Sequence, residues 1–350
     1  MLIVRPSHPA DLPALLDLAR TLPVGVTSLR GGEAALAGKL EAAAAAFAEA
    51  VVEPGDQSYL FSLTDSVTDR VLGVAGLVGA VGLVEPFYNY RLETLVHASR
   101  PLGIHHRVEV LSLCHDLTGH SALNALAILP EWRTAETVAL LCRVRLLFAA
   151  AHPQRFADQW ICELLGVCDD AGQSPVWGSL GRHFFGIDYR LAEDYCATRG
   201  RSFIAEMLPQ HPIYVSLLTP AAQAALGQRH PLAGLSAGIL QQEGFHPGRY
   251  LDIFDGGPVI EASRGAIATL RDFRRLTVCV TSRLPQADAC LLANDRLDGF
   301  RAIKAPAAVD CEQAQVMLAP ATAIALGVES GSALLVREGG GDAGAHDQAG

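Results

Sequence analysis

The sequence predicts a mixed α/β (α+β) fold that ends in a small β-rich domain. Two observations support this prediction. Short apolar runs of strand-like composition alternate with helix-like runs through the first 270 residues. From about residue 271 the pattern changes to short β-rich pieces separated by turns. We therefore expect a mixed sheet with flanking helices over residues 1–270, a barrel-like domain over residues 271–338 and a disordered tail over residues 339–350.

Strands of the larger domain are predicted where short apolar runs stop at Gly, Pro or charged residues. These runs are residues 2–5, 59–63, 71–84, 93–98, 108–113, 122–129, 159–165, 203–208 and 250–254. The last run ends in Asp255-Gly256-Gly257-Pro258, which is a strong turn signal.

Helices are predicted where apolar residues recur at helical spacing or where capping residues stand at the ends. Asp11 and Thr219 stand at the N-termini of two of them; Gly227 ends the helix that Thr219 begins, and Gly244 ends another. The predicted helices are residues 11–19, 33–51, 133–151, 176–185, 189–197, 219–226 and 232–243.

The C-terminal domain has its own pattern of short segments. Its predicted strands are residues 277–281, 289–293, 300–303 and 333–337, and its one predicted helix is residues 320–326. Strands this short, joined by turns, are typical of a small barrel.

Composition excludes several classes of protein. Half of the 350 residues are hydrophobic, which is enough for a large buried core. The formal net charge of −10 argues against general nucleic-acid binding. Lys39 and Lys304 are the only lysines, so nearly all positive charge is Arg. Arg suits bidentate capture of carboxylate and phosphate, although a GC-rich genome gives the same bias.

The sequence also indicates a compartment. Charged residues interrupt the N-terminal apolar residues too early for a secretory signal, and the most apolar stretch, residues 71–84, is too short to span a bilayer. The eight cysteines are scattered without a Cys-x-x-Cys pair, so neither a zinc site nor a disulfide framework is indicated. We expect a cytoplasmic protein with reduced thiols, no bound metal and no membrane contact.

Residues 85–121 are the most informative part of the chain. Tyr, Asn, Arg, Glu, His and Asp are packed there between apolar runs that are predicted as buried strands. Because hydrogen-bonding side chains are costly to bury, this density indicates a pocket for a polar small molecule.

Several long segments resemble the arginine N-succinyltransferases, which move a succinyl group from succinyl-CoA to the α-amino group of arginine. They are GVTSL (25–29), EPFYNYRLETLVHASRPLGIHHRVEVLSLCHDLTGHS (85–121), SPVWGSLGRHFFGIDY (174–189), AEMLPQHPIY (205–214), GQRHP (227–231) and EGFHPGRYLDIFDGGP (243–258). The 85–121 block and AAAHPQRFAD (149–158) are most similar to the alpha subunit of the two-subunit arginine/ornithine form. The N-terminal strand-then-helix pattern is similar to that of the GCN5-related N-acetyltransferases.

The resemblance implies a fold, an activity and partners. The fold would be an acyl-CoA N-acyltransferase domain followed by a small β domain. The activity would be the first step of arginine degradation, with arginine or ornithine as acceptor and succinyl-CoA as co-substrate rather than as a permanently bound cofactor. The partner would be a homologous beta subunit or further copies of the chain. Two alternatives stay open: an N-acyltransferase for another amine, and a non-catalytic subunit of a heteromeric enzyme.

The resemblance also assigns residues to the reaction. It makes His230 the proton donor, which suits a side chain that changes charge near neutral pH. It makes Leu126, on the predicted strand 122–129, a contact of succinyl-CoA. A solvent-exposed turn histidine and a core leucine are the alternative interpretations.

Arg133 begins the turn at which single-chain members bind CoA pyrophosphate with an Arg-x-x-Gly-x-Gly pattern. This chain reads Arg133-Thr134-Ala135-Glu136-Thr137-Val138, so both glycines are absent and Glu136 adds negative charge. Only Gly lets a phosphate approach the backbone closely. The same loss is found in the alpha subunit, and it implies that a beta partner does most of the CoA binding.

Arginine as substrate requires a carboxylate for its guanidinium and a basic group for its carboxylate. The acidic candidates are Glu93, Asp116, Asp252 and Asp255, and the basic candidate is Arg91. A polar loop cap is the alternative role of Asp116, and a turn before Gly256 is the alternative role of Asp255.

Overall fold

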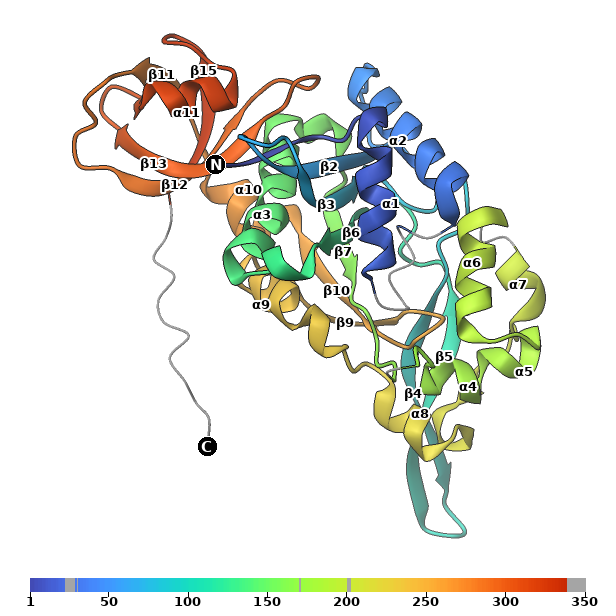
Figure 1. The fold of residues 1–350 in the computed structure, drawn as a ribbon. Helices are drawn as coiled ribbons and strands as arrows, with labels where there is room; N and C mark the ends of the chain where they lie inside the picture. Colours follow the sequence, from blue (N-terminus) through green and yellow to red (C-terminus); the bar gives the residue numbers. More distant parts are fainter. Residues whose placement is uncertain (23–28, 30, 170, 200–202, 339–350) are drawn as a thin grey trace.

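The computed structural model describes residues 1–22, 29, 31–169, 171–199 and 203–338. Most of the GVTSL segment and the predicted tail at residues 339–350 lie outside this part of the chain. Within it, one continuous sheet runs from a C-terminal barrel through the body of the molecule (Figure 1). The predictions of a mixed α/β fold and of a C-terminal barrel are confirmed.

The body of the sheet is antiparallel throughout except between β6 and β7. In spatial order its strands are β1 (Leu2–Pro6), β2 (Ser58–Asp65), β3 (Val71–Val78), β6 (Ser121–Ile128), β7 (Gln159–Glu163), β10 (Pro258–Ser263), β9 (His246–Leu251), β4 (Asn89–Ser99), β5 (Ile104–Cys114) and β8 (Ile213–Tyr214).

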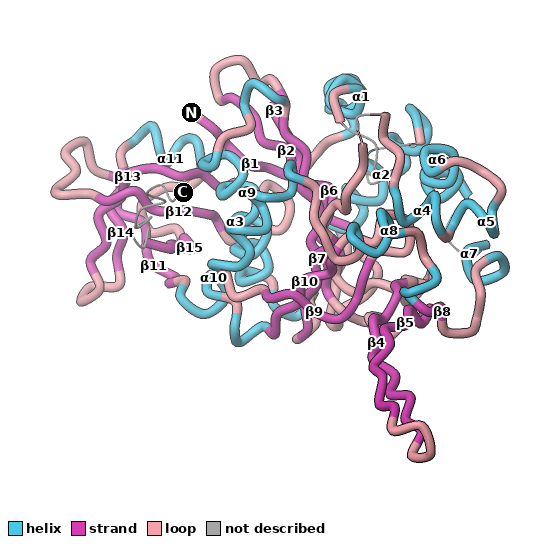
Figure 2. Tube along the Cα trace, turned by 90° about the horizontal axis from the view of Figure 1, so that it is seen from below, coloured by secondary structure: helices cyan, strands magenta, loops and turns pink. Residues whose placement is uncertain are grey.

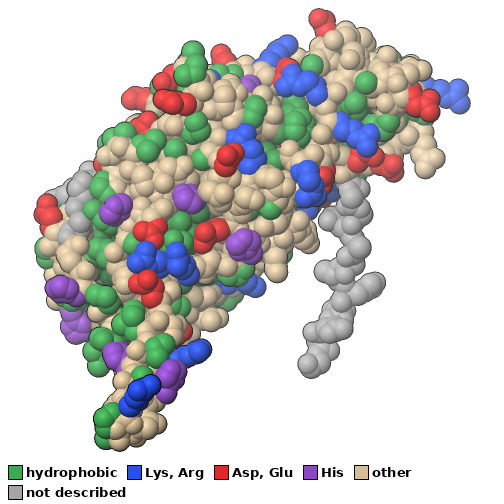
Figure 3. Space-filling model, turned by 180° about the vertical axis from the view of Figure 1, so that it is seen from behind, with side chains coloured by type: hydrophobic (Ala, Val, Ile, Leu, Met, Phe, Trp, Pro, Cys, Tyr) green, Lys and Arg blue, Asp and Glu red, His purple; other side chains and the backbone are tan. Residues whose placement is uncertain are grey.

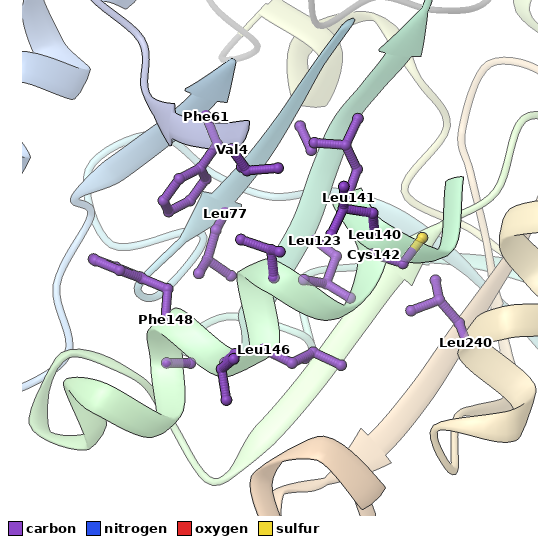
Figure 4. Packing of buried hydrophobic residues seen from close by; sticks show 14 of the residues in the cluster. Val4, Phe61, Leu77, Leu123, Leu140, Leu141, Cys142, Leu146, Phe148 and Leu240 are labelled. Carbon is purple, nitrogen blue, oxygen red and sulfur yellow. The ribbon is translucent and has the colours of Figure 1, made fainter. Parts of the chain in front are cut away.

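Helices cover both faces of this sheet. α1 (Leu12–Arg20) and α2 (Gly32–Ala48) form one layer, and α3 (Ala135–Ala151), α9 (Gly234–Gln242) and α10 (Ala268–Asp272) form the other. Strand β2 shows why both layers are needed: Leu60 packs with α1 and α2 on one face, whereas Tyr59 and Phe61 pack on the other face with α3 and with the C-terminal end of α2. Successive strand residues point to opposite faces, so a strand covered on both sides is apolar along its whole length. Figure 4 shows the α3 side of this packing, with Phe61, Leu77, Leu123, Leu146 and Phe148.

A helical layer lies beside β4, β5 and β9 (Figure 1). It consists of α4 (Pro175–Ser179), α5 (Gly181–Phe185), α6 (Tyr189–Arg199), α7 (Phe203–Met207) and α8 (Pro220–Ala225). Trp177 and Tyr189 are buried at its centre against Phe254.

The C-terminal domain is a closed five-stranded barrel. It comprises β11 (Arg274–Val280), β12 (Asp288–Asn294), β13 (Ala302–Asp310), β14 (Gln315–Leu318) and β15 (Ala333–Glu338), with α11 (Pro320–Leu326) beside them. Pairing of β12 with β13 closes it. Leu292 and Val336 fill its interior, whereas Leu291 and Leu335 point outward into the core around α3. This outer face fixes the barrel to the body.

Strands β4 and β5 form a long arm. All eleven residues of β4 pair with β5, but β9 covers β4 only at Tyr90 and Arg91, and β8 covers β5 only at Val110 and Leu111. The rest of the hairpin projects away from the body (Figure 2). No described helix is both long enough and apolar enough to cross a membrane.

Three predicted strands need correction, and the helix predicted at 176–185 is two helices, α4 and α5, separated at Leu180. Residues 203–208 are predicted as a strand, but Phe203–Met207 is helical, since Ile204 and Leu208 are four residues apart and both are buried. The strand predicted at 250–254 ends at Leu251, because the Asp252 side chain accepts the N–H groups of Phe254 and Asp255 and turns the chain. The strand predicted at 71–84 ends at Val78.

Candidate active site

A cleft of about 690 Å³ opens where strands β6 and β7 diverge. The two strands are parallel and pair only at Ser121 with Trp160 and at Ala122 with Ile161. Beyond these pairs β6 continues beside β3, and β7 continues beside β10. Residues 122–126 and 161–165 therefore line opposite walls of the cleft.

An irregularity in β6 shapes the first wall. The pairing of β3 with β6 shifts register between Val74 and Gly76, and Ala125 has a left-handed φ of 52°. Gly76 permits this geometry, because a Cβ there would overlap the side-chain oxygen of Asn124. The bulge turns the segment around Leu126 toward the cleft, which Leu126 lines.

His230 lies beside the cleft. It precedes a 3-10 turn (Pro231–Ala233), and its backbone N–H donates to the carbonyl of Leu165 over 2.7 Å. Its ring Nδ1 accepts the N–H of Leu232 at 3.2 Å. Leu165 and Leu232 both line the cleft, so His230 is held at the edge of the cleft by two wall residues, although it does not line the cleft itself. Because Nδ1 is an acceptor here, the neutral ring carries its proton on Nε2.

Arg133 and the start of α3 lie at the cleft too. Arg133 lines the cleft, and its Nη2 donates to the carbonyl of Leu232 over 2.6 Å. Burial lowers the pKa of the Arg133 guanidinium. The Thr134 hydroxyl accepts the N–H of Thr137 as an N-cap. One of the free N–H groups at this end of the helix is therefore already hydrogen-bonded within the protein. Glu136 pairs with Lys304 of the barrel at 3.1 Å, which offsets its negative charge.

Acidic groups gather on the β7 side. Asp255 is buried and lines the cleft; its carboxylate accepts the N–H groups of Gly166 and Gly257, each at 2.7 Å. Burial, with Asp252 nearby, raises the pKa of Asp255 well above its usual range. Asp252 and Glu163 line the same cleft, and Glu163 accepts a hydrogen bond from Asn89 at 2.9 Å.

The other predicted substrate residues form a separate cluster on β4 and β5. Arg91 donates to Asp116 at 2.6 Å and lies 3.1 Å from Glu93. The Ser112 hydroxyl donates to Glu93, and the Tyr250 hydroxyl donates to Asp116. None of Arg91, Glu93 and Asp116 lines the cleft, and these ion pairs and hydrogen bonds lower the pKa of both carboxyls although desolvation opposes them. Their role in binding stays a prediction.

Among the charged residues that line the cleft, the sequence did not single out Glu163 or Arg145. Arg145 is only 1 % exposed, and its guanidinium donates to the carbonyls of Leu141, Gly76 and Asn124. A signal was available, because Arg145 interrupts the apolar run of the predicted helix 133–151. Among the described residues no cluster of His, Cys, Asp or Glu is arranged to hold a metal ion.

The cleft thus has two chemical ends. Apolar backbone-lined walls and Arg133 lie toward β6 and α3, and three carboxyl groups (Glu163, Asp252 and Asp255) lie toward β7. Such a site can hold a long ligand along a strand edge beside a cationic ligand, with the His230 imidazole at its margin.

Comparison with known proteins gives matches along almost the whole chain. A family model described as "Arginine N-succinyltransferase beta subunit" matches residues 2–269, and one for the C-terminal domain of that subunit matches residues 274–336. The chain is similar to arginine N-succinyltransferase subunit alpha of Pseudomonas aeruginosa, with 42% identity over 97% of this chain and 98% of the relative.

Two further relatives extend the comparison. The arginine N-succinyltransferase of Salmonella schwarzengrund is 40% identical over 86% of this chain and 88% of its own length. The solved structure of arginine/ornithine succinyltransferase subunit AI from P. aeruginosa superimposes with a TM-score of 0.87 and 40% identity, covering 97% of this chain and 98% of that one.

Proposed function

Because this chain belongs to the arginine N-succinyltransferase family, we propose that it transfers the succinyl group of succinyl-CoA to the α-amino group of L-arginine. The name of the P. aeruginosa relative favours an alpha-type subunit. The reaction would be the first step of arginine degradation, and ornithine is the second acceptor to test. The eight cysteines are free thiols, which favours a cytoplasmic location.

The observation that carries the proposed mechanism is the divergence of β6 and β7. Past Ala122 the edge of β6 that faces the cleft has no parallel partner in the described chain, so its N–H and C=O groups are available to a ligand, apart from the Asn124 carbonyl, which accepts from Arg145. The amide-containing pantetheine arm of CoA is a ligand of that kind. The divergence supports an N-acyltransferase fold of the GCN5-related type, with the thioester near Leu126.

His230 would act as the proton donor. The neutral α-amine attacks the thioester carbonyl, the C–S bond breaks, and the net proton movement runs from nitrogen to sulfur. With Nδ1 occupied by the Leu232 N–H, the Nε2–H of His230 is the group that donates to the departing thiolate.

The acidic end of the cleft supports arginine as acceptor. Glu163 lies on β7, and Asp252 and Asp255 line the same cleft. The segment that follows β7 carries Leu165, whose carbonyl accepts the backbone N–H of His230. A guanidinium bound by the carboxylates of Glu163 or Asp252 would leave the α-amine directed toward His230. Asp255 accepts backbone N–H groups on both carboxylate oxygens, whereas Asp252 does so only on Oδ1; Asp255 would therefore shape this end rather than bind the substrate directly.

The test is thiol release from succinyl-CoA in the presence of arginine, measured on the purified chain. We expect His230→Ala to lower kcat by about 10²–10⁴-fold, the usual contribution of a general acid. His246→Ala is the matched control, since His246 is an exposed histidine of β9 and has no hydrogen bond to a residue that lines the cleft, whereas the hydrogen-bond partners of His230 line it. Full activity of His230→Ala would eliminate the proton-donor role.

The same assay separates the alternatives. Faster release with another acyl donor or amine would identify a different N-acyltransferase. No release by the chain alone, followed by release after a homologous chain is added, would identify a non-catalytic or dependent subunit, and would agree with the missing glycines at residues 133–138.

The projecting arm supports a second copy of this chain as partner. Leu95, Val96, Leu102 and Ile104 are 38%, 54%, 71% and 53% exposed, and a two-stranded hairpin uncovered on both faces is marginally stable in water. Residues 95–108 contain Arg100, Arg107 and three histidines but no acid, whereas the whole chain has a net charge of −10. Hydrophobic, His and basic side chains are visible along the arm (Figure 3). This composition complements the acidic body of another copy.

Light scattering tests the partner. We expect a dimer that dissociates in the double variant Leu95→Glu/Ile104→Glu, while Ile324→Glu, an exposed apolar position on α11, leaves the dimer intact. A monomer at micromolar concentration contradicts association with a second copy. Assembly only with a homologous chain would replace the homodimer with a heteromer.

A further inference from the structure

Arg145 is a buried cation without a counter-charge. It lies on α3, is 1 % exposed, and lines the cleft between β6 and β7. Its hydrogen-bond acceptors are neutral: Nε donates to the Leu141 carbonyl, and Nη1 donates to the carbonyls of Gly76 and Asn124, all at 3.1 Å. No carboxylate of the described chain forms an ion pair with it.

The neighbouring thiols do not supply the missing charge. Burial raises the pKa of Cys142, and it raises the pKa of Cys162 to about 12, although the Arg145 charge acts in the opposite direction on both. Both thiols are therefore neutral at physiological pH. A buried, unpaired charge is costly to a folded protein. The presence of such a charge in a ligand cleft indicates that an anionic ligand supplies the counter-charge when it binds.

The position of Arg145 defines which part of the ligand it meets. Nη1 holds the carbonyl of Asn124, two residues before Leu126, so the guanidinium lies at the bulge of β6. Two residues of strand span roughly 7 Å, which is close to the reach of a four-carbon dicarboxylic acyl group. The three carbonyls engage Nε and Nη1 and fix the plane of the guanidinium, which leaves the two N–H groups of Nη2 to donate to a carboxylate.

We propose that Arg145 binds the distal carboxylate of the succinyl group and thereby sets the acyl-donor specificity of the enzyme. This inference rests on the proposed function. It adds a specificity-determining residue that acts on the acyl donor.

The decisive experiment compares succinyl-CoA with butyryl-CoA, which has the same four acyl carbons and a methyl group in place of the carboxylate. We expect Arg145→Met to lower kcat/KM for succinyl-CoA by about 30-fold or more, as for loss of one partner of a buried charge pair. The value for butyryl-CoA should stay unchanged or rise, so that the preference for succinyl-CoA disappears.

Arg155→Met is the matched control. Arg155 is equally buried and donates to the carbonyls of Ala46 and Glu49 and to the Tyr59 hydroxyl, but it does not line the cleft. Its replacement should destabilise the fold and leave the ratio between the two donors unchanged. An equal loss for both donors in Arg145→Met would show that Arg145 only supports the bulge, and would overturn the proposal.

Two further measurements keep the inference testable if Arg145→Met does not fold. Arg145→Lys retains the charge and should retain a preference for succinyl-CoA. On the unaltered chain, the Kd of succinyl-CoA should be about 30-fold or more below that of butyryl-CoA; equal Kd values would overturn the proposal. Failure of the proposed function has a different signature, namely binding of succinyl-CoA without thiol release when arginine is added.

Discussion

Asp255 makes the stability of the fold depend on pH. Its carboxylate holds the N–H groups of Gly166 and Gly257, and there is no room beside it, since a Cβ on Gly166 would lie 2.5 Å from Oδ1. Burial, assisted by the nearby charge of Asp252, raises the pKa of Asp255 above its unfolded value. The folded protein therefore keeps a proton that the unfolded chain releases, and the free energy of unfolding should fall as pH rises from about 4 toward the folded pKa.

We predict that Asp255→Asn removes this pH dependence. At pH 5 the variant should be less stable by about 1–3 kcal/mol, because one of the two N–H groups loses its acceptor. Between pH 5 and pH 8 it should lose less stability than the unaltered protein does. Urea unfolding at both pH values checks this, with the exposed Asp158→Asn as control. Equal pH slopes in the two proteins would show that Asp255 is ionised across this range.

At the scale of one element, strand β6 carries the site. Its bulge depends on Gly76 in the neighbouring strand, where any side chain would overlap Asn124. We predict that Gly76→Ala lowers the free energy of unfolding by about 1–3 kcal/mol through overpacking. Because the bulge also positions the wall around Leu126, the Kd for succinyl-CoA should rise.

Gly38→Ala is the control for this prediction. Gly38 lies on α2, and no atom lies within 4 Å of the position that a Cβ would occupy there. Replacement of a helical glycine by alanine should raise stability by about 0.5–1 kcal/mol. Denaturant titration and calorimetric binding of succinyl-CoA measure both effects. If Gly76→Ala behaves like Gly38→Ala, the bulge does not depend on a missing side chain.

At the scale of the whole molecule, Glu243 joins three parts of the chain. It is fully buried, and its carboxylate contacts Arg143 of α3 at 2.9 Å, Arg337 of the barrel at 3.0 Å, and the Thr269 N–H of α10 at 2.8 Å. Together with Leu291 and Leu335, it fixes the barrel against the body.

We predict that Glu243→Gln lowers the free energy of unfolding by about 2–4 kcal/mol, since hydrogen bonds to a charged group are lost in a buried site. Both arginines retain some solvent exposure, which limits the loss. Asp272→Asn, which removes an exposed ion pair with Arg271, should change stability by less than about 1 kcal/mol. Similar small effects of both substitutions in urea unfolding would contradict a joining role for Glu243.

Local patterns predicted much of the fold. The cap at Thr219 and the apolar run of 133–151 predicted α8 and α3, and the change of pattern near residue 271 predicted the barrel. The prediction for 203–208 is wrong because a short apolar segment does not distinguish strand from helix, and β10 was missed. Resemblance to a family, rather than periodicity, directed attention to Leu126 and His230.

By itself the sequence determined the class of fold, the order of most elements and the family, because these follow from composition, spacing and motifs that are local in the chain. Only the tertiary structure decided that β6 and β7 separate after two pairs, that Asp255 faces the cleft while Arg91, Glu93 and Asp116 pair with one another, and that Arg145 enters the same cavity. Each of these depends on contacts between residues that are far apart in sequence. The pairing of strands creates such contacts, and no local pattern encodes them.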